Sequence, residues 1–425
     1  MEILVLSQYW FPEEGAPQRR WQWLSGILKD LGHNVTAIAP PPVYRRRLSK
    51  RQWLNQQLRS VFRPSGETGP SGEMILRSPF VQAGRSVRIR ALNQIVVSVG
   101  TTVTAVRRTV TTGSKPDIVI GTVPALPTLF AARAVSRFFR IPLVVDLRDA
   151  WPELLTHMED WGKETTRAGF IAGLRSTGIL KSVLAHIFLA SYGRASAIIV
   201  TTDSHAESLK RSIGRGAPPI HVIRNVFPPS VALERPEKNV SEHEFNSLNV
   251  LYAGTVGRAQ QITNAVEAVA IARDYFEVHV NLRIIGDGAG WEAVKKHAAE
   301  LDIPLDLRHH ISPRDLTPHY QWADTALVHL AAWHALETTV PSKLYELMVV
   351  GKHITVVANG EAARLVRDLE AGATVTPGDP EKLARVWSDL ANDRPLRAST
   401  AGREWVQHQA AVASDTLRTV IEDVQ

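Results

Sequence analysis

Cysteine is absent from the 425-residue sequence. Without thiols the chain forms no disulfide, no cysteine-ligated zinc site and no iron–sulfur cluster, and it has no cysteine nucleophile. This excludes a small secreted domain that depends on disulfides and is compatible with a reducing cytoplasm. Hydrophobic residues make up 44% of the chain and charged residues 21%. That composition is typical of a globular protein with a full core, not of a disordered or coiled-coil chain.

Long apolar runs are also missing. The longest charge-free stretch of the first half, Ala91–Val106, is interrupted by asparagine, glutamine, serine and threonine. A membrane-spanning helix needs about 20 mostly apolar residues, so we predict no transmembrane span. The opening run Met1–Ser7 is short and carries an acid where a secretory signal needs a basic start. We therefore expect a cytoplasmic protein.

Three common signatures of metal and phosphate chemistry are absent too. The sequence contains no G-x-x-x-x-G-K-[ST] phosphate loop, no H-E-x-x-H zinc motif and no Asp-x-Asp pair of the kind that holds a metal against a sugar nucleotide. We therefore expect no bound metal and no cofactor.

The net charge of +7 hides a difference between the two halves of the chain. Residues 1–225 carry 30 basic and 15 acidic residues, whereas residues 226–425 carry 19 and 27. Stretches of the first half without any acid are Leu31–Gly66, Met74–Pro116 and Thr165–Thr202. Such a basic half indicates an anionic partner. Because basic and apolar residues alternate there, an anionic membrane surface is favoured over nucleic acid. A solvated basic face without a specific partner explains the charge equally well.

Apolar runs alternate with helical patterns in two successive series. Strands are predicted in the first series at Glu2–Ser7, Val35–Ala39, Asp117–Gly121, Leu143–Asp146, Ala197–Thr201 and His221–Ile223. A polar linker follows at residues 229–248, and the second series has strands at Asn249–Tyr252, His279–Ile285, Ala326–Val328, His353–Val357 and Thr374–Thr376. Alternating strands and helices are typical of parallel sheets. The sequence predicts an α/β protein of two doubly wound domains.

A glycine-rich turn follows one strand of the second series. Gly286-Asp287-Gly288-Ala289-Gly290 has the spacing G-x-G-x-G, which does not match the dinucleotide fingerprint G-x-G-x-x-G. A tight turn that lets helix and strand pack explains these glycines better. A loop at this edge of the sheet can still contact a nucleotide.

The segment Glu337–Glu346 runs from a polar loop into a helix that Pro341 and Ser342 begin. The free N–H groups and the dipole of a helix N-terminus attract phosphate, and Lys343 adds a full charge. Glu346, one turn further on, can accept two ribose hydroxyls. The alternative is an ordinary capped helix with a Lys–Glu pair on its surface.

This segment, with the pattern E-x-x-x-P-S-K-x-x-E, resembles the sugar-nucleotide site of GT-B-fold retaining glycosyltransferases. The resemblance is greatest to the family 4, or group 1, enzymes that build bacterial capsules, lipopolysaccharide and cell-wall glycans. Further segments that resemble this family, in the expected order, are Ser7–Gly15, Asp146–Glu153, Tyr252–Gly257, Ile285–Gly288, Trp322–Asp324 and Ala371–Pro380. The likeness covers nearly the whole chain.

The resemblance implies a GT-B fold of two Rossmann-like domains facing across a cleft that closes during the reaction. Residues 1–228 would bind the acceptor, residues 249–404 the nucleotide sugar, and a helix over residues 405–425 would cross back to the first domain. The implied reaction moves a sugar, with retention, from a UDP- or GDP-sugar to a glycan or lipid-linked acceptor in cell-envelope or exopolysaccharide synthesis. The basic first domain would then hold the enzyme on the inner face of the membrane, with no role for nucleic acid.

The resemblance also assigns roles to residues. Without a metal, Lys343, Arg258 and the helix start would stabilise the diphosphate, Glu346 would hold the ribose and Glu337 would meet the donor sugar or shape its pocket. The full set implied for the donor is Gly15, Gly254, Gly257, Arg258, Gly286, Glu337, Val340, Pro341, Ser342, Lys343 and Glu346. The loop at Arg308–Ile311, with that at Gly286, would contact the nucleobase.

The acceptor side is implied at Asp146, Arg148 and Asp149. Asp149 would orient or deprotonate the acceptor hydroxyl, with Lys343 and Glu346 as the other catalytic residues. The alternative for Asp149 is that it only caps the segment that follows it.

Two positions depart from the family pattern. No lysine follows Arg258 before Arg273, and the two glutamates are nine residues apart instead of the commoner eight. The sugar and base preferences of better-known members therefore do not carry over. A nucleotide-sugar epimerase of the same fold and a non-catalytic scaffold remain the alternative functions, and the sequence does not indicate the oligomeric state.

Overall fold

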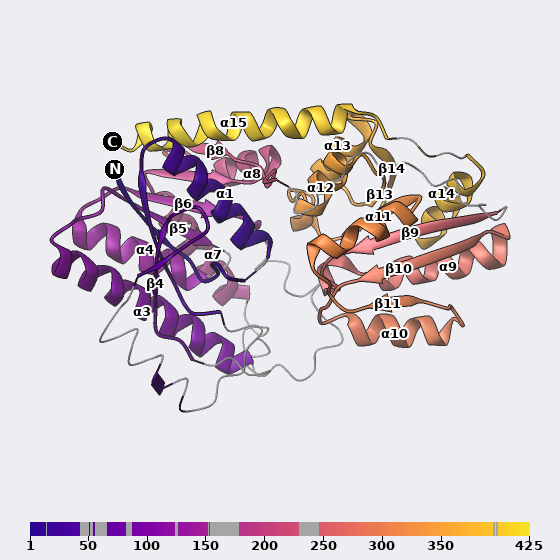
Figure 1. Ribbon diagram of the computed structural model, residues 1–425, viewed down its shortest axis with the longest axis horizontal. Helices are drawn as coiled ribbons and strands as arrows, with labels where there is room; N and C mark the ends of the chain where they lie inside the picture. The colour runs from indigo at the N-terminus through magenta and orange to yellow at the C-terminus, as the bar shows by residue number, and fades with distance from the viewer. Residues whose placement is uncertain are drawn as a thin grey trace. The chain divides into compact units, whose positions relative to one another are not determined.

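The computed structural model describes two compact units (Figure 1). One comprises Met1–Phe227 together with Ala411–Gln425, and the other comprises Pro228–Ala410. The residues that the structure describes are 1–13, 15–42, 51, 54–55, 66–81, 87–123, 126–151, 153, 178–228, 246–393, 396 and 398–425. Most of the linker predicted at residues 229–248 lies outside them.

The first unit is built on a sheet whose eight described strands run in the order β3-β4-β2-β1-β5-β6-β7-β8. Neighbouring strands are parallel except for the pair β3 and β4. The strands are β1 (Glu2–Leu6), β2 (Asn34–Ala39), β3 (Glu67–Thr68), β4 (Met74–Arg77), β5 (Ile118–Val123), β6 (Leu143–Leu147), β7 (Ala197–Val200) and β8 (Ile220–Val222). The helices are α1 (Ala16–Asp30), α3 (Val87–Thr112), α4 (Leu126–Phe139), α7 (Gly178–Tyr192), α8 (Asp203–Ile213) and the end of α15 (Ala401–Asp423).

Helices cover both faces of this sheet because its strands are apolar on both sides. Alternate residues of a strand point to opposite faces. Ile3 and Val5 pack with α1 and α15, whereas Leu4 and Leu6 pack with α4, α7 and α8. The apolar side chains that α15 and the residue after it add to the first core are Ala413, Leu417, Val420, Ile421 and Val424.

The second unit has a parallel sheet whose six described strands run in the order β11-β10-β9-β12-β13-β14. The strands are β9 (Ser247–Ala253), β10 (His279–Ile285), β11 (Asp306–Arg308), β12 (Thr325–His329), β13 (His353–Val357) and β14 (Gly372–Val375). The helices are α9 (Thr263–Phe276), α10 (Trp291–Glu300), α11 (Thr317–Trp322), α12 (Ser342–Val350), α13 (Gly360–Asp368) and α14 (Pro380–Asn392), with short 3-10 turns at Arg258–Gln260, Pro313–Leu316 and His334–Leu336.

The predicted fold class, two α/β domains with parallel sheets, is confirmed. One boundary is corrected: β9 begins at Ser247, inside the predicted linker, because Ser247 pairs with His279 and extends the ladder. Among the described residues, none of the helices has the length and apolarity that crossing a membrane requires.

Candidate functional site

In the second unit, the predicted donor residues follow the carboxyl ends of neighbouring strands. Gly254, Gly257 and Arg258 follow β9, Gly286 follows β10, and the loop that leads to Glu337 follows β12. Because β10, β9 and β12 are adjacent and parallel, these segments meet at one edge of the sheet, which is where open α/β sheets bind ligands.

Glycines allow the loops after β9 and β10 to touch. A Cβ atom at Gly286 would lie 1.7 Å from the carbonyl oxygen of Gly254, and one at Gly288 would lie 2.1 Å from that of Val256. The backbone N–H of Val256 donates to the carbonyl of Asp287 at 3.0 Å. The glycines therefore serve close packing of two loops, as the tight-turn explanation predicts. Donor contacts at Gly254, Gly257 and Gly286 stay predictions.

A buried hydrogen-bond network lies at the start of α12. The Lys343 ammonium donates to Glu346 Oε1 at 3.0 Å and to the Tyr320 hydroxyl at 3.1 Å, and that hydroxyl donates to Glu346 Oε1 at 2.8 Å. Glu346 and Tyr320 are buried, whereas the Lys343 side chain is 26% exposed. The Lys–Glu pair of the alternative interpretation is therefore present, but it does not lie on the surface, because the Glu346 carboxylate is buried.

Tyr320 was not predicted as a site residue. It lies on α11, 23 residues before Lys343, and no local pattern connects it with α12. Its position two residues before the Trp322–Asp324 segment is the one signal that the sequence offers.

The backbone at Glu337 is hydrogen-bonded to the start of α13. The Glu361 N–H donates to the carbonyl of Glu337 at 3.0 Å, and a Cβ atom at Gly360 would lie 2.0 Å from that oxygen. Gly360 also has a φ of +67°, so glycine is required there on both grounds. The Glu337 side chain lies 3.2 Å from Nδ1 of His334.

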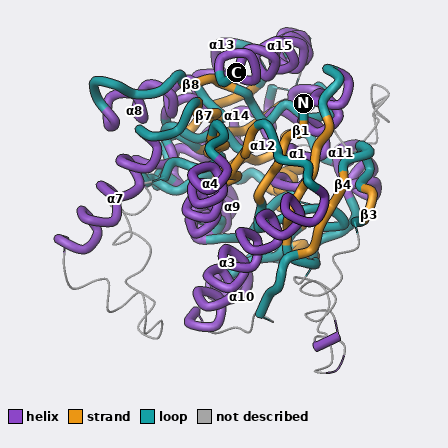
Figure 2. The backbone as a smooth tube through the Cα atoms, turned by 90° about the vertical axis from the view of Figure 1, so that its left-hand side faces the viewer, coloured by secondary structure: helices purple, strands orange, loops and turns teal. Residues whose placement is uncertain are grey.

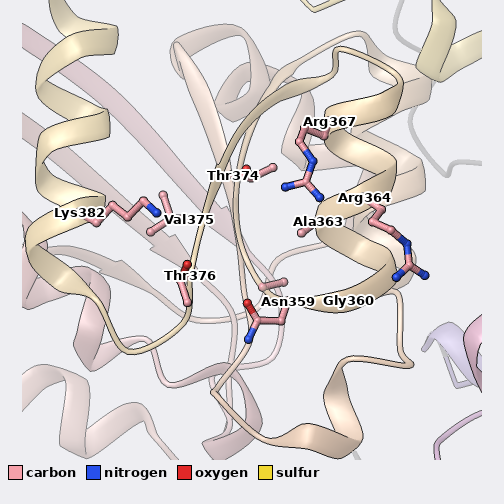
Figure 3. A pocket seen from close by; sticks show the side chains of 10 residues that line it. Asn359, Gly360, Ala363, Arg364, Arg367, Thr374, Val375, Thr376 and Lys382 are labelled. Atoms are coloured by element: carbon pink, nitrogen blue, oxygen red, sulfur yellow. The ribbon is translucent and has the colours of Figure 1, made fainter.

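A basic pocket of about 350 Å³ adjoins Gly360 (Figure 3). Its lining includes three cations and no carboxylate. Arg367 and Lys382 extend toward β14 from α13 and α14, whereas Arg364 points away (Figure 3). This pocket was not predicted from the sequence. Its signal was an Asn-Gly pair after a strand, followed by two arginines three residues apart.

The predicted nucleobase loop is held against the loop after β10. His309 Nδ1 lies 2.6 Å from one oxygen of Asp287, and the His310 N–H donates to the other at 3.0 Å. The hydrogen bond from His309 lowers the pKa of the Asp287 carboxyl. The His309 ring stacks on Trp291 with 4.3 Å between centroids. The structure thus brings Gly286 and the Arg308–Ile311 segment together.

In the first unit, Gly15 precedes α1 with an extended backbone, φ −136°. An added Cβ atom would meet the end of the flexible Gln18 side chain at 2.6 Å. Neither the backbone nor a rigid neighbour requires glycine here, so approach to a diphosphate stays a prediction for Gly15.

Asp146, at the end of β6, is fully buried in an ion pair. Its Oδ1 accepts from Arg20 at 2.9 Å and its Oδ2 from the Trp21 indole at 2.9 Å. Arg20 also donates to the carbonyl of Ile223 and to the side chain of Asn225. Because both oxygens are bonded to interior donors, we expect Asp146 to position α1 and not to touch an acceptor.

Arg148 and Asp149 come directly after the last residue of β6, Leu147. Burial raises the pKa of the Asp149 carboxyl, and the neighbouring Arg148 opposes that rise. Asp149 is partly exposed, so it remains the candidate for contact with an acceptor hydroxyl. Of the resembling Asp146–Glu153 segment, Pro152 lies outside the described residues.

The family models match both units. A glycosyl transferase 4-like domain matches residues 15–226, and the glycosyl transferases group 1 model matches residues 234–404. The chain is similar over its length to the putative colanic acid biosynthesis glycosyl transferase WcaI of Escherichia coli (strain K12), with 25% identity over 443 residues that cover 100% of both chains.

Two solved structures share the fold. Sucrose-phosphate synthase from Thermosynechococcus elongatus has a TM-score of 0.69 at 15% identity, covering 99% of this chain and 98% of that one. Anabaena Alr3699/HepE in complex with UDP has a TM-score of 0.64 at 14% identity, covering 99% and 100%. Together with the two family models, this likeness shows that the chain belongs to the GT-B-fold glycosyltransferases, with a glycosyl transferase 4-like domain followed by a group 1 domain.

Proposed function

We propose that this glycosyltransferase moves a hexosyl group, with retention, from a UDP- or GDP-sugar to a glycan or lipid-linked acceptor in cell-envelope or exopolysaccharide synthesis. The observation that carries the proposal is the network of Lys343, Glu346 and Tyr320 at the start of α12. The relative named for colanic acid biosynthesis and the neighbour solved with UDP support the donor class and the setting.

The donor half of the reaction requires positive groups that stabilise the leaving diphosphate. Breaking the bond between sugar and diphosphate leaves negative charge on phosphate oxygens, and preorganised positive groups lower that barrier. The α12 N-terminus supplies its dipole and Lys343 its ammonium, with Arg258 after β9 as a second cation. Glu346, oriented by Tyr320, would accept the ribose hydroxyls, and Glu337 would meet the sugar.

The acceptor half is assigned to the loop after β6. Asp149 would orient the attacking hydroxyl or take its proton, because its burial raises the pKa of the carboxyl and makes it a better base. Arg148 lies beside it. Asp146 would act through Arg20 and Trp21, by fixing α1.

A titration of UDP and of GDP in the presence of EDTA tests the donor site. We expect one of the two nucleotides to bind with micromolar affinity by isothermal titration calorimetry, because fixed cations replace a metal. Binding should be unchanged when EDTA is replaced by Mg²⁺. No heat with either nucleotide contradicts the donor proposal, and binding that appears with Mg²⁺ alone contradicts its metal independence.

We propose that the first unit docks on an anionic membrane through α3, α4 and α7. These helices contain basic residues and no Asp or Glu. Exposed apolar side chains on α3 are Leu92, Ile95, Val99, Val103 and Val110, and their spacing places them along one stripe. Helices α3 and α4 are in contact (Figure 2), and Phe130 of α4 meets Phe188 of α7. A basic, apolar surface of this kind suits anionic lipid.

Flotation with phosphatidylglycerol-containing vesicles at low salt tests whether α3, α4 and α7 form a membrane-docking surface. The wild-type protein should float, and Val99→Glu should reduce binding roughly tenfold, because burying a valine contributes about 1.5 kcal/mol or more and the new charge is repelled. Tyr275→Glu, at a 79% exposed residue of the second unit, adds the same charge and should float like wild type. Failure of the wild type to float, or equal binding by both variants, contradicts the surface.

A further inference from the structure

A charged side chain that makes no hydrogen bond with the described residues is buried in the first unit. Arg148 is 8% exposed, and its Nε, Nη1 and Nη2 atoms are all buried without a hydrogen-bond partner among the described residues. Taking a guanidinium out of water without compensation costs several kcal/mol, and buried polar groups of native proteins are nearly always paired. The described part of the first unit provides no hydrogen bond that would offset this cost.

The neighbouring carboxyl groups stabilise the charge of Arg148 but make no hydrogen bond with it. The carboxylate of Asp146 is bonded to Arg20 and Trp21, and Arg20 is itself a cation beside Arg148. Burial raises the pKa of Asp149, whereas the charge of the neighbouring Arg148 lowers it. An arginine stays protonated even when burial lowers its pKa, because the ordinary value lies above about 12. The guanidinium of Arg148 therefore stays charged, and its donors are bonded to none of these neighbours.

The position of Arg148 is that of a ligand-binding residue. It follows β6 at the carboxyl edge of the sheet, one residue beyond the last pair of the β5–β6 ladder, Val123 with Leu147. The strand order changes direction between β1 and β5, and β6 is the neighbour of β5; such a switch point is where open α/β sheets bind ligands. Tyr9, in the loop after β1, is close enough to influence the Arg148 pKa.

We infer that Arg148 receives an anionic group, a phosphate or a carboxylate, on the acceptor substrate. The planar guanidinium fork matches the paired oxygens of both groups and can bind either with two hydrogen bonds. That the ligand is the acceptor rests on the proposed transferase function. The anion site itself is inferred from the geometry of the first unit alone. The acceptor is accordingly an acidic glycan or a sugar joined to phosphate, and a neutral sugar would leave the guanidinium unpaired.

Small probes of each chemistry test the site without a donor. Glucose 1-phosphate, glucuronate and glucose are titrated into the full-length protein at constant ionic strength, with binding followed by calorimetry and by thermal unfolding. At least one of the two anionic probes should bind and raise the melting temperature, and neutral glucose should bind at least tenfold more weakly. Which anion binds separates a phosphate-linked from an acidic-sugar acceptor.

Variants of Arg148 test whether this residue binds the anion. Arg148→Met should weaken the anionic probe at least tenfold while leaving the melting temperature of the free protein equal to or above that of wild type, because an unpaired buried charge is removed. Arg148→Lys keeps the positive charge but not the planar guanidinium, so its affinity for the anionic probe should lie between those of wild type and Arg148→Met. Arg215→Gln removes an equal charge from an exposed position of the same unit and should change neither reading.

Two results would overturn the inference. One is that neither anionic probe binds better than glucose; the other is that Arg148→Met binds the anion like wild type. UDP and GDP are titrated into the same preparations, because the site proposed for them lies in the second unit. If the protein binds a nucleotide but not the anion, the inference about Arg148 is wrong and the donor proposal stands. If the protein binds the anion but no nucleotide, the donor proposal is wrong and the anion site stands.

Discussion

Lys343→Met is expected to weaken binding of the preferred nucleoside diphosphate about 10- to 100-fold. A hydrogen bond to a charged group contributes about 1.5–3 kcal/mol, and the ammonium of Lys343 is the cation that Tyr320 and Glu346 hold at the start of α12. Donor turnover should fall further, about 100- to 1000-fold, because charge on the leaving phosphate is greatest in the transition state. Calorimetry measures the first effect and release of nucleotide from the donor the second.

Lys382→Met is the matched control for this variant. Lys382 is an exposed lysine of the same unit, and it lines the basic pocket beside α13. If α12 holds the diphosphate, Lys382→Met should leave nucleotide affinity within about twofold of wild type. The reverse pattern, with affinity lost in Lys382→Met and kept in Lys343→Met, would move the diphosphate from α12 to the pocket between α13 and α14.

The fold could be predicted because its strands are buried on both faces. Strands of parallel sheets that are covered on both faces read as continuous apolar runs, and β1, β7 and β13 are visible as such runs. Helices α3 and α7 were not predicted. Both lack acids altogether, and α3 is rich in valine and threonine, which favour strands over helices when tertiary contacts are unknown.

The candidate site was predictable where it is local in sequence. Lys343 and Glu346 lie one turn apart on a single helix, so their pairing follows from helical spacing. Tyr320 and Gly360 belong to other elements, and their contacts with Glu346 and Glu337 exist only after the sheet has formed. The same holds for Arg148, whose lack of a hydrogen bond to the described residues is a property of the folded unit and leaves no mark on the sequence.

The ion pair of Arg20 and Asp146 joins residues 126 positions apart. Both side chains are 0% exposed, and their atoms lie 2.9 Å apart. Removing one partner of a buried pair leaves the other charge uncompensated, at a cost of about 3–5 kcal/mol. Asp146→Asn should therefore lower the free energy of unfolding of the first unit by about this amount, measured by urea denaturation.

The double variant Arg20→Met/Asp146→Asn shows whether the loss comes from the unpaired charge. With both charges gone, most of the lost stability should return, because a buried ion pair and a well-packed apolar replacement differ little in net stability. Arg215→Met, an exposed change of equal charge, should be neutral within about 0.5 kcal/mol. If the double variant is as unstable as the sum of the single ones, the hydrogen bonds of Arg20 to Ile223 and Asn225, and not the ion pair, hold α1 in place.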